Sequence, residues 1–469
     1  MIRPHKPVRV AISGKHHVAL KQHLFPGDGN EAVAFALCGR ARRENLELLT
    51  VREIVPIPYD ACSIRTPHRV TWSGAALEPT LARATAENLA LVKLHSHPTG
   101  YPWFSDTDDV AEGELFPSLF GWLDSEAPLA SIIMLPDGSL VGRAVHPSGG
   151  GDRLDCIRVA GDDFSFWHDT PEPDNLPEHG IRIAQAFGTQ TYALLRKLRI
   201  GVVGCSGTGS IVIEQLARNC VGELVLVDPD HVEHKNLNRI LNSTVRDAES
   251  GEAKTRVLKR AIQRIGLGTK VIAFEDDLMG REILKALSTC DILVGCMDSI
   301  DGRHVLNKLA SAYVIPLIDV GVRLEADGMG GIDSIWATAH TVLPGGSSLL
   351  SRRVYNSADL DSAFLKRYNP EAYEEKRNLG YIKGIREDQP AVISVNMTAS
   401  ATAVNELLAR LHPYRLKPNR AFAIRRISLT DSEADSNEPE GEPCTVMQRW
   451  VGVGDQEPFL GMPELGDAE

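Results

Sequence analysis

Residues 199–239 contain a complete strand–loop–helix–strand unit, and this unit limits the folds open to the chain. The first apolar run ends at a glycine cluster, a helical pattern opens directly after it, and a second apolar run ends at Asp228. The cluster consists of Gly204, Gly207 and Gly209. Glycines let backbone N–H groups approach a phosphate, the helix N-terminus favours its negative charge, and a carboxylate roughly 20 residues further on binds ribose hydroxyls. The stretch therefore predicts a nucleotide site in an α/β domain.

The overall composition narrows the class of protein further. A chain of 469 residues is too long for one core, so about two or three domains are expected. The net charge of -12 argues against nucleic-acid binding. The chain lacks an apolar run of the length that spans a bilayer, and its start lacks a signal-peptide core, so we expect a cytoplasmic protein without membrane partners. Eight scattered cysteines without a CxxC pair indicate reduced thiols.

The order of patterns along the chain predicts two α/β domains. Residues 1–148 mix short strands with helices, which predicts a mixed sheet. Residues 149–179 are rich in Asp, Glu, Pro and Gly and are expected to form a linker. Alternating strands and helices over 180–415 predict a Rossmann-like domain with a parallel-rich sheet. Residues 416–469 form a carboxy-terminal extension, in which the acidic segment 431–443 is expected to be flexible.

A histidine pair in the first domain has the spacing of metal ligands. His95 and His97 stand two residues apart at the end of an apolar run, so an extended strand places both on one face. Ser105 and Asp108 follow a loop rich in Pro and Gly, with the acid near a helix start. Two imidazoles and one carboxylate leave zinc a fourth position for water. The combination of HxHP and SxxD therefore predicts a metal site.

With these residues, the amino-terminal segment resembles the JAMM (Mov34/MPN) family of zinc isopeptidases, whose pattern is an early Glu, then HxHP and SxxD. The resemblance implies a JAMM-like metalloprotease domain with three zinc ligands: His95, His97 and Asp108. Ser105 would help to stabilise the developing oxyanion, and Glu31 would be the general base. Glu47 and Glu53 are alternatives for the base, and a role for Glu31 as a surface acid is also left open.

The residues after the glycine loop distinguish between kinds of nucleotide chemistry. After Asp228 the sequence reads DPDHVEHKNLNRI, then GEAK, then CMDSIDGR. In this order the motifs resemble the ThiF-type superfamily, the adenylating domains of ubiquitin-activating enzymes and of sulfur-carrier activators, over about residues 180–415. A glycine loop alone would have favoured a dehydrogenase, which becomes the weaker alternative.

The ThiF resemblance implies chemistry on ATP with Mg²⁺. Attack of a carboxylate on the α-phosphate builds negative charge that Arg239 and Lys254 would neutralise. Asp298 would hold Mg²⁺, Asp228 would bind the ribose, and Asn236 would help to position the phosphates. The other expected nucleotide contacts are Gly204, Gly207, Gly209 and Asp230. Each residue alone has the alternative of an exposed charge or a helix cap, but their order favours the nucleotide site.

Three departures from the ThiF pattern refine this prediction. Arg182 only partly matches the arginine that reaches into a partner subunit, and with it the sequence implies a homodimer. The places of the two zinc-binding CxxC pairs read PGGSSLLSR and EPCTVMQ, and Cys444 alone cannot hold zinc, so no zinc is expected in this domain. No cysteine is a convincing thioester-forming residue, and Ser348 or Ser351 is left as an oxyester alternative.

Together the resemblances imply a bifunctional enzyme that acts on a ubiquitin-like protein. The first domain would use Zn²⁺ to hydrolyse a peptide or isopeptide bond beyond a carboxy-terminal glycine, and the second would adenylate the exposed carboxylate. A conjugating enzyme would be a further partner, in a bacterial conjugation system for defence, by fold-level analogy. The alternatives are a sulfur-carrier protein adenylyltransferase with a trimming metalloprotease, and a scaffold with an inactive site.

Overall fold

The computed structural model describes residues 5–169, 176–326, 329, 331–379 and 392–465. The chain divides into two compact units. The amino-terminal unit comprises the residues up to 171 together with Ala312–Val314 and Trp450–Gly461, and the carboxy-terminal unit comprises the rest. Within the described ranges, no helix combines the length and the apolar character that crossing a bilayer requires.

A mixed nine-stranded sheet forms the amino-terminal unit. Across the sheet the strands are β11 (Phe164–His168), β10 (Cys156–Ala160), β1 (Val8–Ser13), β3 (Leu46–Pro56), β2 (Val33–Arg43), β6 (Ala90–Ser96), β7 (Leu129–Met134), β8 (Leu140–Val145) and β9 (Gly151–Arg153). The other elements are α1 (Gly14–Leu24), α2 (Glu78–Ala86), α3 (Asp106–Leu123) and a hairpin of β4 (Cys62–Thr66) and β5 (Arg69–Trp72). Every residue of β6 is buried, as expected for a nearly continuous apolar run in a central strand.

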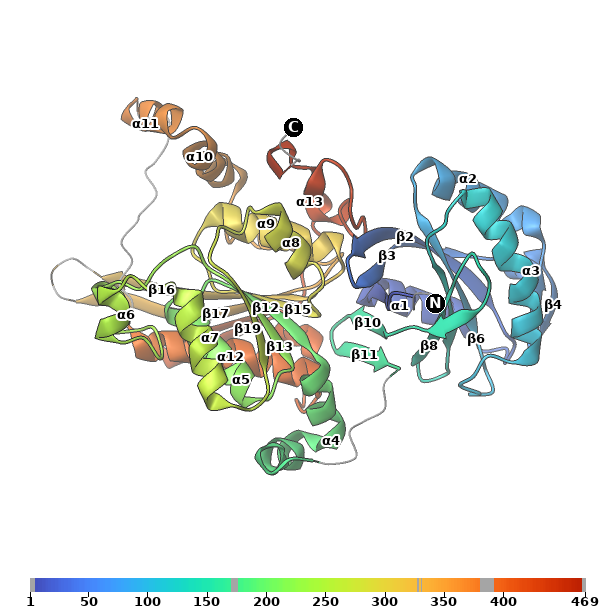
Figure 1. Ribbon diagram of the computed structural model, residues 1–469, viewed down its shortest axis with the longest axis horizontal. Helices are drawn as coiled ribbons and strands as arrows, with labels where there is room; N and C mark the ends of the chain where they lie inside the picture. The colour runs from blue at the N-terminus through green and yellow to red at the C-terminus, as the bar shows by residue number, and fades with distance from the viewer. Residues whose placement is uncertain (1–4, 170–175, 327–328, 330, 380–391, 466–469) are drawn as a thin grey trace. The chain divides into compact units, whose positions relative to one another are not determined.

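Helix α3 begins at a capping box that the SxxD motif encodes. The Ser105 hydroxyl accepts a hydrogen bond from the backbone N–H of Asp108 at 3.2 Å, and the Asp108 carboxylate accepts one from the backbone N–H of Ser105 at 2.8 Å. Figure 1 shows α3 beside α2 at one side of this unit. The cap fixes Asp108 in the first turn of α3.

The expected linker over 149–179 is wrong for much of its length, because β9, β10 and β11 lie within it. β10 pairs in parallel with β1, and its side chains are buried throughout. Acidic and glycine residues between these short strands dominate the composition of the segment. Composition therefore does not reveal the few apolar residues that make sheet contacts. Residues 170–175 lie outside the described residues.

A segment close to the end of the chain completes the amino-terminal unit. The carbonyl of Gly452 accepts a hydrogen bond from the backbone N–H of Gly39 on β2 at 3.1 Å and from Thr50 Oγ1 on β3 at 2.9 Å. Asp455 pairs with Arg43 at 2.7 Å. These contacts attach Trp450–Gly461 to β2 and β3, far away in sequence.

An eight-stranded sheet forms the carboxy-terminal unit. Its order is β14 (Lys270–Phe274), β13 (Glu223–Val227), β12 (Arg199–Val203), β15 (Ile292–Gly295), β16 (Leu317–Ala326), β17 (Ile332–Val342), β18 (Ile424–Ser428) and β19 (Ser436–Glu438). The helices are α4 (Ile181–Lys197), α5 (Gly207–Arg218), α6 (Val245–Glu249), α7 (Lys254–Ile265), α8 (Arg281–Leu287), α9 (Ile300–Ala312), α10 (Ser357–Tyr368), α11 (Pro370–Asn378), α12 (Ile393–Leu411) and α13 (Thr445–Gln448).

The first five strands of this sheet are parallel, which confirms the predicted Rossmann-like arrangement. Figure 1 shows α5 and α7 on one face of these strands and α8 and α9 on the other. The chain runs outward from β12 to β13 and β14, then returns to β15 on the other side of β12. Ligands of such sheets bind outside the carboxyl ends of the strands at this reversal.

The acidic segment 431–443, expected to be flexible, contains β19, which pairs antiparallel with β18. Glu438 forms an ion pair with Arg426, and Asn437 Oδ1 accepts a hydrogen bond from Arg425 Nε at 3.1 Å. Glu438 and Asn437 therefore contact cations of β18, which composition alone does not reveal. Residues 466–469 of the carboxy-terminal extension lie outside the described residues.

Hydrogen bonds join the segment PGGSSLLSR to the chain at and just before EPCTVMQ, the two places where the ThiF resemblance would have placed CxxC pairs. Glu440 accepts hydrogen bonds from the backbone N–H of Ser347 at 2.5 Å and from Arg352 Nη2 at 3.0 Å. The backbone N–H of Cys444 donates to the carbonyl of Gly346 at 2.9 Å. Cys444 is buried at the N-cap of α13, directly after the segment that was expected to be flexible.

Replacement of Gly39 by alanine should destabilise the amino-terminal unit. A Cβ at Gly39 would lie 2.3 Å from backbone atoms of Val453, so β2 and the Trp450–Gly461 segment cannot keep their hydrogen bonds. We expect a loss of about 1–3 kcal/mol, measured by thermal unfolding. The matched control is Gly113→Ala inside α3, where a Cβ meets nothing within 4 Å and should stabilise by about 0.5–1 kcal/mol. An unchanged unfolding midpoint in Gly39→Ala would contradict this packing.

Candidate functional sites

Two histidines and an aspartate converge at the end of β6. His95 Nε2 lies 2.9 Å from Asp108 Oδ1 and 3.1 Å from His97 Nε2, and His97 Nε2 lies 3.4 Å from Asp108 Oδ2. All three residues are buried, and one ligand atom from each lies within 4.8 Å of the others. This spacing brings the three side chains within reach of a single metal ion.

Burial and hydrogen bonds shift the pKa values of all three side chains. Burial lowers the pKa of His95 to about 4, so its imidazole is neutral, as a ligand must be. Burial alone would lower the pKa of His97, but its hydrogen bonds with Asp108 and with the carbonyl of Tyr101, 2.8 Å from Nδ1, raise it. Burial alone would raise the pKa of Asp108, but hydrogen bonds from both histidines hold it well below its ordinary value. Once a metal ion replaces the protons shared with Asp108, two imidazole nitrogens and one carboxylate fit Zn²⁺ with an open fourth position.

Glu31 lies beside this group, just before β2. Its backbone N–H donates to the carbonyl of Thr66 at 2.9 Å, and its own carbonyl accepts from Arg65 Nε at 3.1 Å, so the β4–β5 hairpin holds it in place. Burial raises the pKa of Glu31 to about 7; the charge on His97 opposes this shift and that on Asp108 reinforces it. The carboxyl therefore titrates near neutral pH, which suits a general base.

The remaining predicted residues of this unit lie as follows. The Ser105 hydroxyl donates to Asp108 Oδ2 at 2.7 Å, so it contacts the carboxylate of the candidate ligand directly. Glu47 and Glu53, the alternative bases, lie on β3 and pair with Arg42 at 3.9 Å and Arg83 at 2.7 Å. In the sheet, β2 separates β3 from β6. A second group with metal-binding side chains has two exposed members; it consists of His5, His146 and Asp152.

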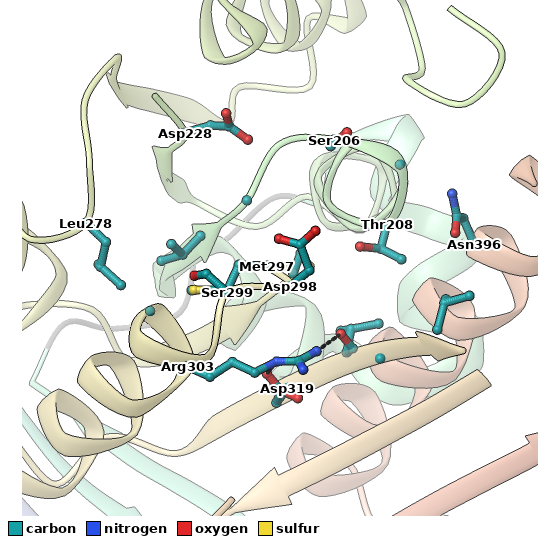
Figure 2. A pocket seen from close by; sticks show the side chains of 18 of the residues that line it. Ser206, Thr208, Asp228, Leu278, Met297, Asp298, Ser299, Arg303, Asp319 and Asn396 are labelled. Atoms are coloured by element: carbon teal, nitrogen blue, oxygen red, sulfur yellow. Dashed lines mark hydrogen bonds and ion pairs between the residues drawn. The ribbon is translucent and has the colours of Figure 1, made fainter. Parts of the chain in front are cut away.

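A cavity of about 1060 Å³ in the carboxy-terminal unit lies at the carboxyl ends of β12, β13 and β15. More cationic side chains than carboxylates line it, which favours an anionic ligand. Figure 2 shows Asp228, Asp298, Thr208 and Asn396 around this cavity. Its lining includes most of the residues predicted to contact the nucleotide: Gly204, Gly207, Asp228, Asp230, Asn236, Arg239, Lys254 and Asp298.

The glycine loop approaches its neighbours so closely that side chains cannot fit. A Cβ on Gly209 would lie 1.8 Å from the carbonyl oxygen of Gly204, and one on Gly207 would lie 2.3 Å from Asn396 Nδ2. Gly204 has φ +93°, which favours glycine. Gly209 thus acts through packing, and it allows the first turn of α5 to present its backbone N–H groups to an anion.

Two aspartates hold Lys254 at the start of α7. Lys254 Nζ donates to Asp230 Oδ2 at 2.6 Å and lies 3.8 Å from Asp228 Oδ1. Asp228 also accepts from the backbone N–H groups of Cys205 at 2.6 Å and Asp230 at 2.9 Å. Burial raises the pKa of Asp228, and the charge of Lys254 opposes that shift. The buried ammonium is therefore fixed in the cavity wall.

The other predicted residues differ in their exposure. Arg239 is half-buried, and its Nη1 donates to the carbonyl of Lys235 at 2.8 Å. Asn236 is buried, and its Oδ1 accepts from the backbone N–H of Glu233 at 3.1 Å. Asp298 is exposed beyond the end of β15. Arg182 is exposed on α4 and is absent from the described cavity lining of its own chain.

Several residues of the cavity were missed in the sequence: Ser206, Thr208, Arg303, Asp319 and Asn396. Arg303 Nε lies 3.2 Å from Asp319 Oδ1, and Figure 2 shows this pair beside Asp298. Arg303 belongs to the same CMDSIDGR motif as Asp298, so that motif was the signal for it. Asp319 and Asn396 reach the cavity only through the order of β16 in the sheet and the packing of α12 on α5.

The cysteines of this unit are poorly suited to nucleophilic attack. Burial raises the pKa of Cys205 far above its ordinary value and that of Cys296 to about 12, so both remain thiols. Cys296 is the one thiol in the described lining of the cavity. Ser348 and Ser351, the alternatives for an acyl-enzyme, do not belong to that lining.

The carboxy-terminal unit is a Rossmann-like α/β domain with a cavity where the strand order reverses, which is where such sheets bind their ligands. Residues 180–416, just over half of the chain, match the ThiF family. The chain therefore belongs to the ThiF family.

The relatives of the chain include activating enzymes and adenylyltransferases. Mouse (Mus musculus) adenylyltransferase and sulfurtransferase MOCS3 is 32% identical over 144 residues, which cover 30% of this chain and 29% of that protein. The sulfur carrier protein adenylyltransferase of Thermus thermophilus is 29% identical over 32% of this chain and 54% of its own. Ubiquitin-like modifier-activating enzyme 5 of Dictyostelium discoideum is 24% identical over 52% and 66%. The match thus spans only part of each relative.

Among solved structures, Escherichia coli MccB is similar in fold. MccB with MccA-N7isoASN has a TM-score of 0.45 and 18% identity, over 58% of this chain and 75% of that chain. MccB with ATP has a TM-score of 0.43 and 19% identity, over 59% and 76%.

Replacement of Glu31 by glutamine should remove a pH dependence of stability in the metal-free protein. The folded pKa of about 7 exceeds the ordinary value of 4.5, so the stability that Glu31 contributes is fully present below 4.5 and is lost as pH rises through 7. With a chelator present, the free energy of unfolding of the unmodified protein should fall relative to Glu31→Gln by at most about 3 kcal/mol.

Denaturant unfolding between pH 4.5 and 8 measures this difference. Glu53→Gln, at a partly exposed glutamate on β3, is the matched control and should follow the unmodified protein. Parallel curves for Glu31→Gln and the unmodified protein would contradict the burial of the Glu31 carboxyl.

Proposed function

We propose that the carboxy-terminal unit adenylates the terminal carboxylate of a protein or peptide with ATP and Mg²⁺. Membership of the ThiF family supports this activity, as do the names of the adenylyltransferase relatives. The observation that carries the proposal is the grouping of Arg239, Lys254 and Asp298 around the cavity at the glycine loop.

In the proposed reaction, a carboxylate oxygen of the substrate bonds to the α-phosphorus of ATP, and the bond from that phosphorus to the oxygen bridging to the β-phosphate breaks. Pyrophosphate leaves with the electron pair of the broken bond. Arg239 and Lys254 neutralise the charge that develops on the phosphates, and Asp228 binds the ribose. Mg²⁺ held by Asp298 would supply further neutralisation of the leaving pyrophosphate.

The proposed substrate is a ubiquitin-like protein with a carboxy-terminal glycine, whose adenylate passes to a conjugating enzyme in a bacterial defence system. The name of ubiquitin-like modifier-activating enzyme 5 supports this choice. The second candidate is a sulfur-carrier protein, which the name of the Thermus thermophilus relative favours. The enzyme is proposed to act as a homodimer in which Arg182, exposed on α4, serves the site of the partner.

The amino-terminal unit is proposed to be a JAMM-type zinc peptidase or isopeptidase. The supporting observation is the convergence of His95, His97 and Asp108, with Glu31 beside them. Zn²⁺ held by these three ligands would supply Lewis acidity to the scissile carbonyl and to the attacking water. Glu31 takes a proton from that water and delivers it to the leaving amine, and Ser105 stabilises the developing oxyanion. The bond broken lies beyond the carboxy-terminal glycine of the ubiquitin-like protein.

ATP–pyrophosphate exchange tests the adenylation step. With a ubiquitin-like protein that ends in glycine, exchange should fall by about 10²–10³-fold in Arg239→Ala and in Lys254→Ala, because each loses charge stabilisation in the transition state. Arg246→Ala, at an exposed arginine on α6 outside the cavity lining, is the matched control. Failure of the unmodified enzyme to support exchange with ubiquitin-like or sulfur-carrier proteins would refute the activity. Mass spectrometry separates a conjugating-enzyme thioester from a thiocarboxylate product.

Zinc content and hydrolysis test the first unit separately. The purified protein should hold about one zinc per chain, and His95→Ala should lose it. Glu31→Gln should keep the zinc but hydrolyse a linear extension beyond the glycine about 10²–10⁴-fold more slowly, because it lacks the base. Glu53→Gln is the control with full activity. An active, zinc-loaded Glu31→Gln variant would exclude the role of Glu31.

A further inference from the structure

A buried ion pair in the amino-terminal unit joins β6 to α3, the same two elements that His95 and Asp108 join at the candidate metal site. Lys93 stands two residues before His95 on β6, so the two side chains share a face. Glu112 stands one turn after Asp108 on α3. Lys93 Nζ donates to Glu112 Oε1 at 2.8 Å, and both side chains are 4% exposed. The same strand and helix are thus joined twice, by His95 with Asp108 and by Lys93 with Glu112.

The pair extends into a network with balanced charge. Arg143 on β8 donates through Nη2 to Glu112 Oε2 at 2.7 Å and through Nη1 to Asp109 Oδ1 at 2.6 Å. The hydroxyl of Ser131 on β7 donates to Glu112 Oε1. Two cations therefore face two carboxylates, and every member has a partner. The network holds α3 at two residues, one of them next to Asp108.

The network also reaches the surroundings of His95. The guanidinium of Arg143 lies 3.9 Å from the ring centroid of Phe104, whose ring centroid lies 6.2 Å from that of His95. Arg143 thus connects the network to an aromatic ring beside a candidate metal ligand.

Burying the charges of Lys93 and Glu112 is costly, and apolar residues of similar volume give equal or greater stability in many proteins. What an ion network adds is a fixed geometry between elements, and metal sites need their ligands held to a fraction of an ångström. The candidate ligands come from β6, from the residue directly after it and from α3. The pair of Lys93 and Glu112 also joins β6 to α3, close to these ligands in sequence.

We propose that Lys93, Glu112 and Arg143 are positioning residues for the metal site: they fix α3 against β6 so that Asp108 stays within ligand distance of His95 and His97. This inference rests on the proposed zinc peptidase function of the amino-terminal unit. The three residues act through Asp108 and His95 and contact no reacting atom.

The test is the affinity for Zn²⁺ of Lys93→Met, measured by competition with a chelator. We expect the dissociation constant to rise about 10–100-fold, as for other residues that orient metal ligands, and Lys93→Arg to restore most of the affinity. The control is Arg9→Met, which breaks the 2.6 Å ion pair between Arg9 on β1 and Asp155. In the sheet, β3 and β2 separate β1 from β6. Thermal unfolding midpoints are measured for all variants.

Cobalt gives a readout that a general loss of stability would not change. Co²⁺ in place of Zn²⁺ should show strong visible absorption of a four-coordinate site in the unmodified protein and in Arg9→Met, and a weaker band in Lys93→Met. If Lys93→Met does not fold, Lys93→Met combined with Glu112→Met replaces the pair by apolar side chains and leaves Arg143 with Asp109. This double variant should fold and bind Zn²⁺ equally weakly.

Two results would overturn the inference while the metal site stands. One is unchanged Zn²⁺ affinity and an unchanged Co²⁺ spectrum in the Lys93 variants. The other is a loss of affinity in Arg9→Met as large as in Lys93→Met at a similar unfolding midpoint, which would assign the effect to stability alone. Absence of Zn²⁺ binding in the unmodified protein would instead refute the proposed peptidase site, and the positioning role with it.

Discussion

The approach of the Gly209 backbone to the carbonyl of Gly204 is the constraint around which the carboxy-terminal unit is arranged. A single methyl group at Gly209 would lie 1.8 Å from that oxygen, and one at Gly204 would lie 2.6 Å from the carbonyl oxygen of Cys296 after β15. Three segments, the ends of β12 and β15 and the start of α5, therefore meet through backbone alone. This contact leaves the first turn of α5 open to an anion and places Asp298, two residues after Cys296, at the same cavity. The contact of Asp228 with Lys254 continues the cavity wall beside the loop, because Asp228 also accepts a hydrogen bond from the backbone N–H of Cys205.

The sequence predicts those parts of the two sites whose geometry depends on residues close together in the chain. His95 and His97 share a face because a strand has a period of two, and Asp108 is oriented by a capping box that spans three residues. The glycine loop with Asp228 is local in the same sense. In contrast, Asn396 packs against Gly207 only because α12 lies on α5, and no spacing in the sequence reports that contact. The strands β10 and β11 were missed for the same reason: five-residue strands inside a polar stretch become recognisable only through pairing, here of β10 with β1 and of β11 with β10.

Each unit contains a carboxylate that joins separate segments of the chain through ion pairs and hydrogen bonds. Glu440 accepts hydrogen bonds from Ser347 and Arg352 beside the places of the two CxxC pairs, where the broken pairs predict no zinc. The pair of Lys93 and Glu112 has a comparable arrangement in the amino-terminal unit. In each case the carboxylate bridges segments that are separate in sequence, so the contact defines their relative position rather than adding apolar burial. Desolvation is offset because each acid accepts several hydrogen bonds.

The chemistry proposed for the two units has a definite direction. Hydrolysis beyond a terminal glycine produces a free carboxylate, and a free carboxylate is what adenylation consumes. Hydrolysis of an amide is favourable in water, whereas the acyl-adenylate forms at the expense of ATP, so the first reaction supplies the substrate of the second without reversing it. If the peptidase acts on a precursor, the two steps form one activation sequence. If it acts on finished conjugates, the same carboxylate returns to the adenylating site and ATP is consumed in each cycle.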